Sequence, residues 1–542
     1  MLDRARATVL GAFAAFLAVG FTWGLPSSET WAADSISPRS CGLGAIVETY
    51  TPGHFHNYPP LHMLLLTLLS LPWMAVAASR VGLGMDALAE ELIRPVYMTG
   101  IEVSARLLTA AMAFGILCAT MRLWTRLAGR WIGVVAGAAA GANATFVYYA
   151  RTGNLDVPSF FWVIWTLVEL DRVMAGEPRE ERALLYAAAA ALTKDQAAAA
   201  LLAPVPWALL VVPWLTRRAS PLRPAVARGF AIAVVVYLAV SGAIVNPLGF
   251  RRRVAMLFGP ASQTWAEYPR GLAGAVSLTR DALARIPSLA SWPIAAAAVV
   301  GLTLVLVQRR DRPRATLPAV AAASFAVCFT YAARRSDERF LLPESLLLAP
   351  YAAIALDALR KAWGRPPVVG AAVAGLGPAL VAMASVDATL VADPRYVAER
   401  FLASLPRGTD VDVLGGPIFL PRVPDGLSAV RPGVEPIDDR QRIAGIRELV
   451  DPAMDPRPRH PDVIVLATEL SNVESSEPAR PHPYGLMSYR DPVSRSLLRA
   501  LRDGAYGYRR VLRATCSLPW PLACREIHGS TGREVWIYAR EP

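Results

Sequence analysis

The chain contains almost no lysine. Of its 55 lysine and arginine residues only Lys194 and Lys361 are lysines, so arginine carries the positive charge almost everywhere. Charged residues make up 18% of the 542 residues, below the about 25% of an average soluble domain, whereas hydrophobic residues reach 54% and the mean hydropathy is +0.36. This composition excludes a single soluble domain and indicates a polytopic membrane protein.

Cysteine is also scarce, with five residues scattered along the chain. Cys118 and Cys328 lie in apolar runs, and Cys41 lies in a loop. Only Cys516 and Cys524 have the spacing of a possible disulfide, and such a bond forms only in an oxidising compartment. The sequence contains no internal repeat, and its only low-complexity tracts are alanine-rich spans.

The net charge of +12 would suggest nucleic-acid binding in a soluble protein. Here the arginines cluster in short loops between apolar runs, which is the positive-inside pattern of membrane proteins. We therefore expect no nucleic-acid partner and place these loops in the cytoplasm. They are Arg122/Arg126/Arg130, Arg172/Arg179/Arg182, Arg217/Arg218/Arg223/Arg228, Arg309/Arg310/Arg312/Arg314 and Arg360/Lys361/Arg365.

Apolar segments of membrane-spanning length then predict about 11 transmembrane helices. A long outer loop, 26–105, contains the apolar segment 60–79, which we interpret as a re-entrant or interfacial helix, since a full span there would move every later basic loop to the other side. Cleavage of the N-terminal apolar segment as a signal peptide is an alternative. The spans are predicted near 7–25, 106–122, 131–150, 157–170, 184–194, 197–215, 229–247, 289–307, 316–332, 341–359 and 367–386.

The character of the chain changes after the last span. Residues 390–542 are rich in proline and arginine, and they contain short strand-like runs separated by helical patterns. We predict a transmembrane domain over 1–389 and a soluble extracytoplasmic α/β domain over 390–542, which either recognises an acceptor or serves as a stabilising cap. The strand-like runs are Val411–Leu414, Val463–Leu466 and Val535–Tyr538, and the helical patterns are Tyr396–Leu405 and Ser494–Leu501.

Lys194 is a candidate functional residue because an ionisable side chain at membrane depth is costly and is seldom filler. It lies at the tight turn between the predicted spans 184–194 and 197–215. An ion pair with Asp195, or extension of the side chain toward the interface, is the alternative explanation.

Polar groups collect at the predicted outer ends of the spans. No single one of these motifs is specific for a function, but together their order, their spacing and their shared side of the membrane indicate one site. The pieces are Trp31-Ala-Ala-Asp34, Asn57-Tyr58-Pro59-Pro60-Leu61, Tyr149-Ala-Arg-Thr-Gly-Asn154-Leu-Asp156-Val-Pro158, Leu192-Thr-Lys194-Asp195 and Arg339-Phe-Leu-Leu-Pro343.

With these pieces the chain resembles the GT-C class of membrane glycosyltransferases over roughly residues 5–390, in particular the branch of the protein O-mannosyltransferases and the lipid A aminoarabinose transferase. The resemblance implies a helical GT-C fold. It also implies inverting transfer of a sugar from a polyprenyl phosphate donor on the extracytoplasmic face.

The resemblance places the general base at Asp34, since an attacking hydroxyl needs a carboxylate within reach to take its proton. The family often has Asp-Glu at this point, whereas Ser35 follows here, so a second carboxylate is missing. A capping role in a short interfacial helix is the alternative for Asp34.

The departing phosphate needs fixed positive groups in a poorly hydrated site. Our candidates are Lys194, Arg334, Arg335 and Arg339. The alternative explanation for the three arginines is that they form surface ion pairs with Asp337 and Glu338, which would contribute little to stability.

Asp156, with Arg151 and Asn154 near it, is a candidate for binding the sugar or steadying the outer loops, and it could equally cap the span that begins at Pro158. Tyr58 and Asp195 complete the candidate substrate-binding residues. His54 and His56 lack a clear third ligand, so no metal site is predicted, although a divalent cation stays open. Trp31 and Tyr149 are expected in the interfacial aromatic belt, with stacking on a sugar as the alternative.

We therefore expect an integral membrane inverting glycosyltransferase of the plasma membrane. Its partners would be a polyprenyl phosphate sugar donor, membrane lipid and an acceptor that is a protein, lipid or glycan. The competing hypotheses are a transporter or lipid flippase that uses Lys194 and Asp195 as a relay, and a non-catalytic scaffold.

Overall fold

The computed structural model of the protein describes residues 2–27, 31–32, 35, 42–215, 224–259, 263, 266–307, 312–433, 443–467, 492–527 and 531–541. Asp34 lies outside these residues. The chain divides into two compact units: the first comprises 1–21, 40–70 and 104–384, and the second comprises 22–39, 71–103 and 385–542. The domain limits 1–389 and 390–542 stay a prediction.

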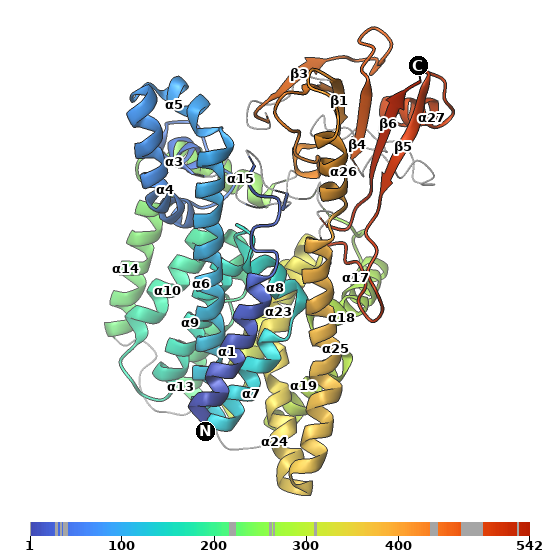
Figure 1. Ribbon diagram of the computed structural model, residues 1–542. Coiled ribbons are helices and arrows are strands. Elements are labelled where there is room, and N and C mark those ends of the chain that lie inside the picture. Colours follow the sequence, from blue (N-terminus) through green and yellow to red (C-terminus); the bar gives the residue numbers. More distant parts are fainter. Residues whose placement is uncertain are drawn as a thin grey trace. The chain divides into compact units, whose positions relative to one another are not determined.

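The first unit is helical (Figure 1). Three helices, α4 (Leu61–Val81), α6 (Pro95–Ala128) and α25 (Arg365–Val391), have residues in both units. The earlier helices are α1 (Leu2–Ala18), α3 (Leu43–Tyr50), α7 (Arg130–Gly141), α8 (Ala144–Ala150), α9 (Asp156–Met174), α10 (Glu180–Thr193), α11 (Asp195–Ala199), α12 (Pro204–Pro206), α13 (Val212–Leu215), α14 (Pro224–Val240) and α15 (Pro247–Phe258). The later ones are α17 (Leu272–Ala284), α18 (Ile286–Leu289), α19 (Trp292–Val307), α20 (Arg312–Ala315), α21 (Leu317–Phe325), α22 (Tyr331–Ala333), α23 (Glu338–Leu348) and α24 (Ala352–Trp363). Shorter turns are the π-helices η1 (Trp207–Val211) and η2 (Ala326–Thr330) and the 3₁₀-helix η3 (Ala349–Tyr351).

Six helical segments among the described residues are long and apolar enough to cross a membrane, and a seventh results if α7 and α8, which are bent by 77° at a short break, form one span. The prediction of a helical polytopic membrane protein is confirmed, whereas the count of 11 spans stays a prediction. The helix α4, which contains most of the segment interpreted as interfacial, is one of the six.

Helix α9 carries a buried acidic residue near each end. Asp171, in its last turn, accepts hydrogen bonds from Arg126 at 2.7 Å and Arg314 at 2.9 Å. These two arginines belong to two of the predicted cytoplasmic loops, and Asp171 adjoins a third. Asp156 begins the same helix, about 22 Å away at 1.5 Å per residue. Three of the five basic loops therefore have a residue at or next to the end of α9 opposite Asp156. The predicted topology stays a prediction.

The second unit contains a six-stranded sheet with strand order β3-β2-β1-β4-β6-β5 (Figure 1). The first four strands are mutually parallel, and β6 and β5 continue the sheet in antiparallel fashion. The predicted strands correspond to β1, β4 and β6, whereas β2, β3 and β5 were not predicted. The strands are β1 (Asp410–Leu414), β2 (Ser428–Gly433), β3 (Ile446–Val450), β4 (Val463–Ala467), β5 (Tyr508–Ala514) and β6 (Val535–Arg540), and this unit also contains α5 (Met85–Leu92), α26 (Pro394–Ala403), the 3₁₀-helix η4 (Pro417–Phe419) and α27 (Pro492–Arg502).

A helix covers each face of this sheet. Strand β4 is apolar at every position, and successive side chains of a strand point to opposite faces. Val463 and Val465 pack with Ala398 and Leu402 of α26, while Ile464 and Leu466 pack with three leucines of α27. The expected α/β character of the C-terminal region is confirmed. Cys516 and Cys524 form a disulfide.

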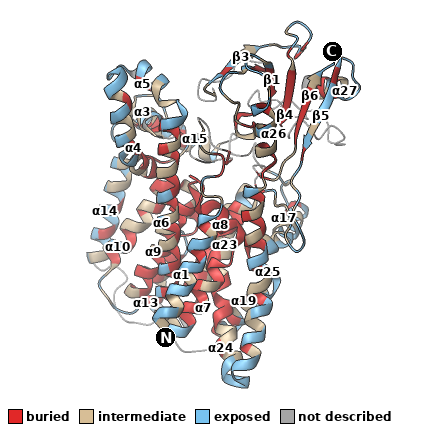
Figure 2. Ribbon diagram, viewed as in Figure 1, coloured by how far each residue is buried: buried red, intermediate tan, exposed pale blue. Residues whose placement is uncertain are grey.

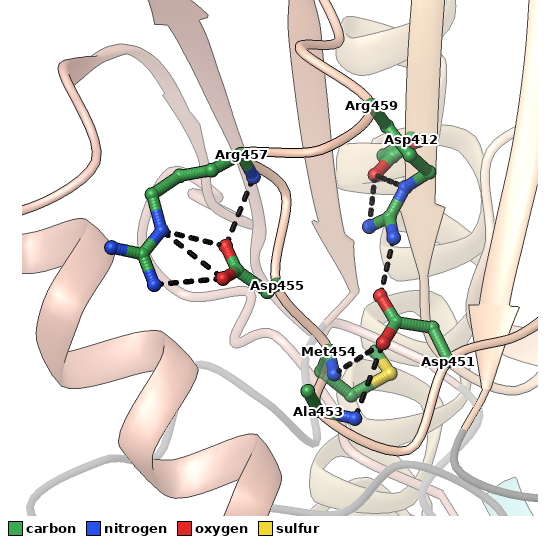
Figure 3. Close-up of polar contacts among 7 residues, drawn as sticks. All are labelled: Asp412, Asp451, Ala453, Met454, Asp455, Arg457 and Arg459. Carbon is green, nitrogen blue, oxygen red and sulfur yellow. Dashed lines mark hydrogen bonds and ion pairs between the residues drawn. The ribbon is translucent and has the colours of Figure 1, made fainter.

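A buried ion-pair cluster lies beside β1 (Figure 3). Arg459 donates hydrogen bonds to Asp412 at 3.0 and 2.7 Å and also contacts Asp451. Asp412 is 2% exposed, and its burial raises the pKa of its carboxyl group above the usual range, although Arg459 opposes the shift. Replacing Arg459 with alanine leaves this carboxylate without its main partner, which should destabilise the fold by about 3–5 kcal/mol.

The pH dependence of that loss follows from the sign of the pKa shift. Because the pKa of Asp412 is higher in the folded than in the unfolded protein, this carboxyl group contributes to folding stability below the unfolded pKa of about 3.9. That contribution is lost as the pH rises through the folded pKa. The melting temperature of Arg459→Ala should therefore fall furthest below that of the wild type near neutral pH, where the unpaired carboxyl group is charged, and should approach it as the pH falls. Arg457→Ala is the matched control, because Arg457 forms an exposed pair with Asp455. An equal loss in both variants would contradict the prediction.

Candidate functional site

The central feature of the first unit is a buried ion pair between Lys194 and Asp156. The Nζ atom of Lys194 lies 2.6 Å from Oδ1 of Asp156, and the two residues are 4% and 7% exposed. They are 38 residues apart in sequence: Asp156 begins α9, and Lys194 lies between α10 and α11. The alternative of a pair with Asp195 is wrong, because Asp195 has a different partner.

A break in the helix presents Lys194 to this site. It follows α10 and precedes α11, and its extended backbone (φ −154°, ψ 125°) interrupts the helix for one residue. This is the tight turn expected between the two spans. On the other side, the Asn154 side chain accepts a hydrogen bond from the Asp156 backbone N–H at 2.6 Å, which shapes the turn into α9. Leu155 occupies the N-cap position of α9, and the carboxylate of Asp156, the first residue of the helix, contacts Lys194.

Three cations surround one aromatic ring next to this pair. The charged groups of Lys194, Arg335 and Arg339 lie 5.8, 4.4 and 4.5 Å from the centre of the Phe340 ring. Phe340 is 2% exposed, and α8, α9 and α23 are largely buried (Figure 2). The charged groups of these three residues would attract a bound anion more strongly than they would in water, because the dielectric constant around them is low.

The predicted phosphate-binding arginines divide into two groups. Arg335 and Arg339 adjoin Phe340, whereas Arg334 donates to the Tyr268 carbonyl at 2.9 Å and to the Gln263 side chain at 2.6 Å. Arg334 thus contacts Gln263 and Tyr268 rather than Phe340, and its left-handed backbone (φ 56°) turns the chain between α22 and α23.

Arg335 also has acidic partners. Its guanidinium lies 3.0 Å from Asp337 and 3.5 Å from Glu267. Asp337 is one of the two acidic residues, with Glu338, that the alternative explanation offered as partners of the arginines.

Asp195 pairs with Arg253 of α15, a residue that the sequence analysis did not single out. Arg253 is 4% exposed. An available signal was its place in the run Arg251–Arg253, which follows a predicted outer turn and so departs from the positive-inside pattern.

The Tyr58 loop belongs to the same unit. The Tyr58 ring lies 6.2 Å from that of His56, whose Nδ1 is 2.9 Å from Glu48. Asn246, the N-cap of α15, ties this loop down: its side chain donates to the carbonyls of Thr49, Thr51 and His54, and accepts from the N–H of Gly53 and Gly249. Helix α15 therefore connects the Tyr58 loop to Asp195.

Arg151 serves a neighbouring structural contact. It is 1% exposed and donates to the backbone carbonyls of Val147 and Val19, which links the end of α8 to the segment after α1. Tyr149 is also 1% exposed, and Trp31 in the second unit is 2% exposed. The aromatic-belt expectation is wrong for both, since belt residues face the membrane interface.

Within the described ranges, no group of three or more His, Cys, Asp or Glu side chains is placed to hold a metal ion. The divalent cation stays an open hypothesis.

No protein-family model and no curated protein matches the sequence. Among solved structures, the chain is similar to ArnT from Cupriavidus metallidurans bound to undecaprenyl phosphate, with 16% identity, coverage of 98% of this chain and 97% of that chain, and a TM-score of 0.48. For ArnT in the apo state the identity is 16%, the coverage 73% and 65%, and the TM-score 0.39.

The oligosaccharyltransferase of Archaeoglobus fulgidus in complex with zinc and sulfate is also similar, with 13% identity, coverage of 75% and 60%, and a TM-score of 0.43. The chain thus spans slightly less than two thirds of that protein and of apo ArnT. ArnT and the archaeal enzyme belong to the GT-C class that the sequence motifs resemble. At these identities and TM-scores, an activity for this chain has to be argued from its own residues.

Proposed function

We propose that the protein is an inverting glycosyltransferase that moves a sugar from a polyprenyl phosphate donor to a hydroxyl acceptor on the outer face of the membrane. The observation that carries this proposal is the buried Lys194–Asp156 pair with Arg335 and Arg339 around Phe340. Three positive charges lie around this one buried ring, where the low dielectric strengthens their attraction for an anion such as the phosphate of a lipid-linked sugar.

The reaction proceeds in one displacement. Asp34 accepts the proton of the acceptor hydroxyl while its oxygen attacks the anomeric carbon. The bond from that carbon to the phosphate oxygen breaks on the opposite face of the sugar, which inverts the configuration. Lys194 and the two arginines stabilise the negative charge that develops on the departing polyprenyl phosphate.

The disulfide between Cys516 and Cys524 supports an extracytoplasmic location for the sheet-containing C-terminal region, because disulfides persist in oxidising compartments. The three basic loops that reach the end of α9 opposite Asp156 support the same orientation for the first unit. We therefore assign the protein to the plasma membrane with the Lys194 end of α9 outward.

Mass spectrometry of the cell envelope, proteins and lipids together, tests the proposal. A deletion strain complemented with the wild-type gene is compared with the same strain carrying an empty vector. We expect a mass increase of the size of a hexose or pentose on one envelope component only when the wild type is present, and its identity names the acceptor class.

An unchanged envelope profile in cells that make the protein stably would overturn the enzyme proposal. Uptake of a substrate into membrane vesicles without any glycosidic product would instead assign the Lys194 site to transport.

A further inference from the structure

The loop closed by the disulfide between Cys516 and Cys524 is apolar and exposed. Its inner residues, Ser-Leu-Pro-Trp-Pro-Leu-Ala, carry no charge. At 93% exposure, Trp520 is the most exposed large hydrophobic side chain among the residues that the structure describes. Tryptophan gains much from burial because of its large apolar area, so its exposure together with apolar neighbours indicates a partner outside the chain.

A turn places Trp520 at the tip of this loop. The Leu522 N–H donates to the Pro519 carbonyl at 2.9 Å, so Trp520 and Pro521 occupy the two central positions of the turn. Pro519 and Pro521 are exposed like Trp520, whereas Leu518 and Leu522 are partly buried. The exposed apolar surface is therefore concentrated at the tip, and the disulfide joins the two ends of the loop behind it.

Two hydrogen bonds attach the chain at the end of this loop to the last turns of α25, within the second unit. The Arg525 N–H donates to the Thr389 hydroxyl at 3.0 Å, and the Ala523 N–H donates to the Ser385 hydroxyl at 3.2 Å. Two residues back along the loop thus correspond to four residues back along the helix, which is about one turn. The chain runs antiparallel to α25 between these contacts, and this course directs the tip of the loop toward the Arg365 end of the helix.

The sequence of α25 places the boundary of the hydrocarbon layer close to Ser385. This helix lies in a segment that is long and apolar enough to cross a membrane. The stretch 366–386 contains no charged residue, and Asp387 is the first acidic residue of the helix. As a helix the stretch is about 32 Å long, which matches the thickness of about 30 Å of the hydrocarbon core of a bilayer. Trp520 is at most about 10 Å of extended chain from Ala523, so it lies within reach of the membrane interface, where tryptophan is enriched.

We propose that the loop 516–524 is a membrane anchor of the C-terminal region, with Trp520 inserted among the phospholipid headgroups and the adjoining acyl chains. The indole ring supplies the apolar area, and its N–H donates to the oxygen atoms of the lipid. Because the loop carries no charge, it enters this layer without the cost of burying one. The anchor is independent of the proposed glycosyl transfer, since it depends only on the position of the loop along α25.

Photo-crosslinking of the full-length protein tests the proposal. The photoreactive amino acid p-benzoylphenylalanine replaces Trp520, and the protein is irradiated in cells and, after purification, in vesicles of phosphatidylethanolamine and phosphatidylglycerol. Since the native side chain is exposed, the melting temperature should stay that of the wild type. We expect intact mass spectrometry to show a gain of one phospholipid mass in both settings.

The same amino acid at Ser428 is the matched control and should gain no lipid. Ser428 is the exposed first residue of β2, and strand pairing places it at the end of the sheet opposite Ala514, where β5 leads into the loop. Cross-linking of position 520 to another polypeptide or to a second copy of the chain would overturn the proposal and assign the loop to a protein interface. No adduct at position 520, or equal lipid yields at both positions, would overturn it as well.

A second measurement uses the native side chain. The difference in fluorescence between the wild type and Trp520→Phe reports the emission of Trp520 alone. Phospholipids that carry bromine on their acyl chains quench tryptophans in contact with them, so this difference should fall in brominated vesicles relative to vesicles without bromine. An undiminished difference would show that Trp520 does not enter the bilayer and would overturn the proposal.

Discussion

Replacement of Asp34 with asparagine should lower glycosyl transfer by about 10²–10⁴-fold, the usual contribution of a general base. Asparagine has nearly the same size and can still accept a hydrogen bond, but it cannot take the proton of the acceptor hydroxyl. Expression and donor binding should stay close to wild type. The measurement is the amount of the glycosylated envelope component in the complemented deletion strain, normalised to the amount of protein.

Asp3→Asn is the matched control for this change, because Asp3 lies in the first turn of α1 and has a side chain that is 92% exposed. It should leave transfer unchanged. Transfer at the wild-type level in Asp34→Asn would remove Asp34 from the mechanism and direct the search for a base to other carboxylates.

Replacement of Lys194 with methionine should have two separable effects. It leaves the Asp156 carboxylate buried without its lysine, which should destabilise the protein by about 3–5 kcal/mol. It also removes a cation from the proposed phosphate site, which should lower kcat by about 10²–10³-fold, as for loss of one stabilising donor of a developing charge. Thermal unfolding in detergent and product formation in membranes measure the two effects.

The double variant Lys194→Met/Asp156→Leu distinguishes folding from catalysis. It contains no unpaired buried charge, so its melting temperature should recover toward that of the wild type, whereas transfer should stay low. Lys361→Met is the control, because Lys361 is the other lysine of the chain and its side chain is 70% exposed beside Asp357. Recovery of transfer together with stability would show that Lys194 is only structural.

The broad class of the protein could be read from its sequence because composition and periodicity are local properties. Long apolar runs with few charges predict membrane helices, and continuous apolar runs predict buried strands such as β4. The edge strand β5 was not predicted from the sequence, because Tyr508–Ala514 contains three arginines and most of the residues in the middle of the strand are exposed. Its pairing with β6 supplies the stabilisation that its own pattern lacks.

Lys194 was a candidate from its sequence context alone, but its partner was not predictable. Asp195 is adjacent in sequence, yet the side chains of successive residues do not face each other, and here the two belong to different ion pairs. Arg253 was not predicted as a partner of Asp195, because only the packing of α15 brings these two distant residues together.

By itself the sequence determined that this protein is a helical membrane protein with an appended α/β region, and it identified Lys194, Asp156 and the arginines 334, 335 and 339 as candidate site residues. Tertiary structure alone decided that Lys194 binds Asp156, that Phe340 lies among three cations, and that Trp31 is buried against Arg395. The physical reason is that burial and ion pairing depend on residues far apart in sequence, whose approach is set by the packing of whole helices and strands rather than by any local pattern.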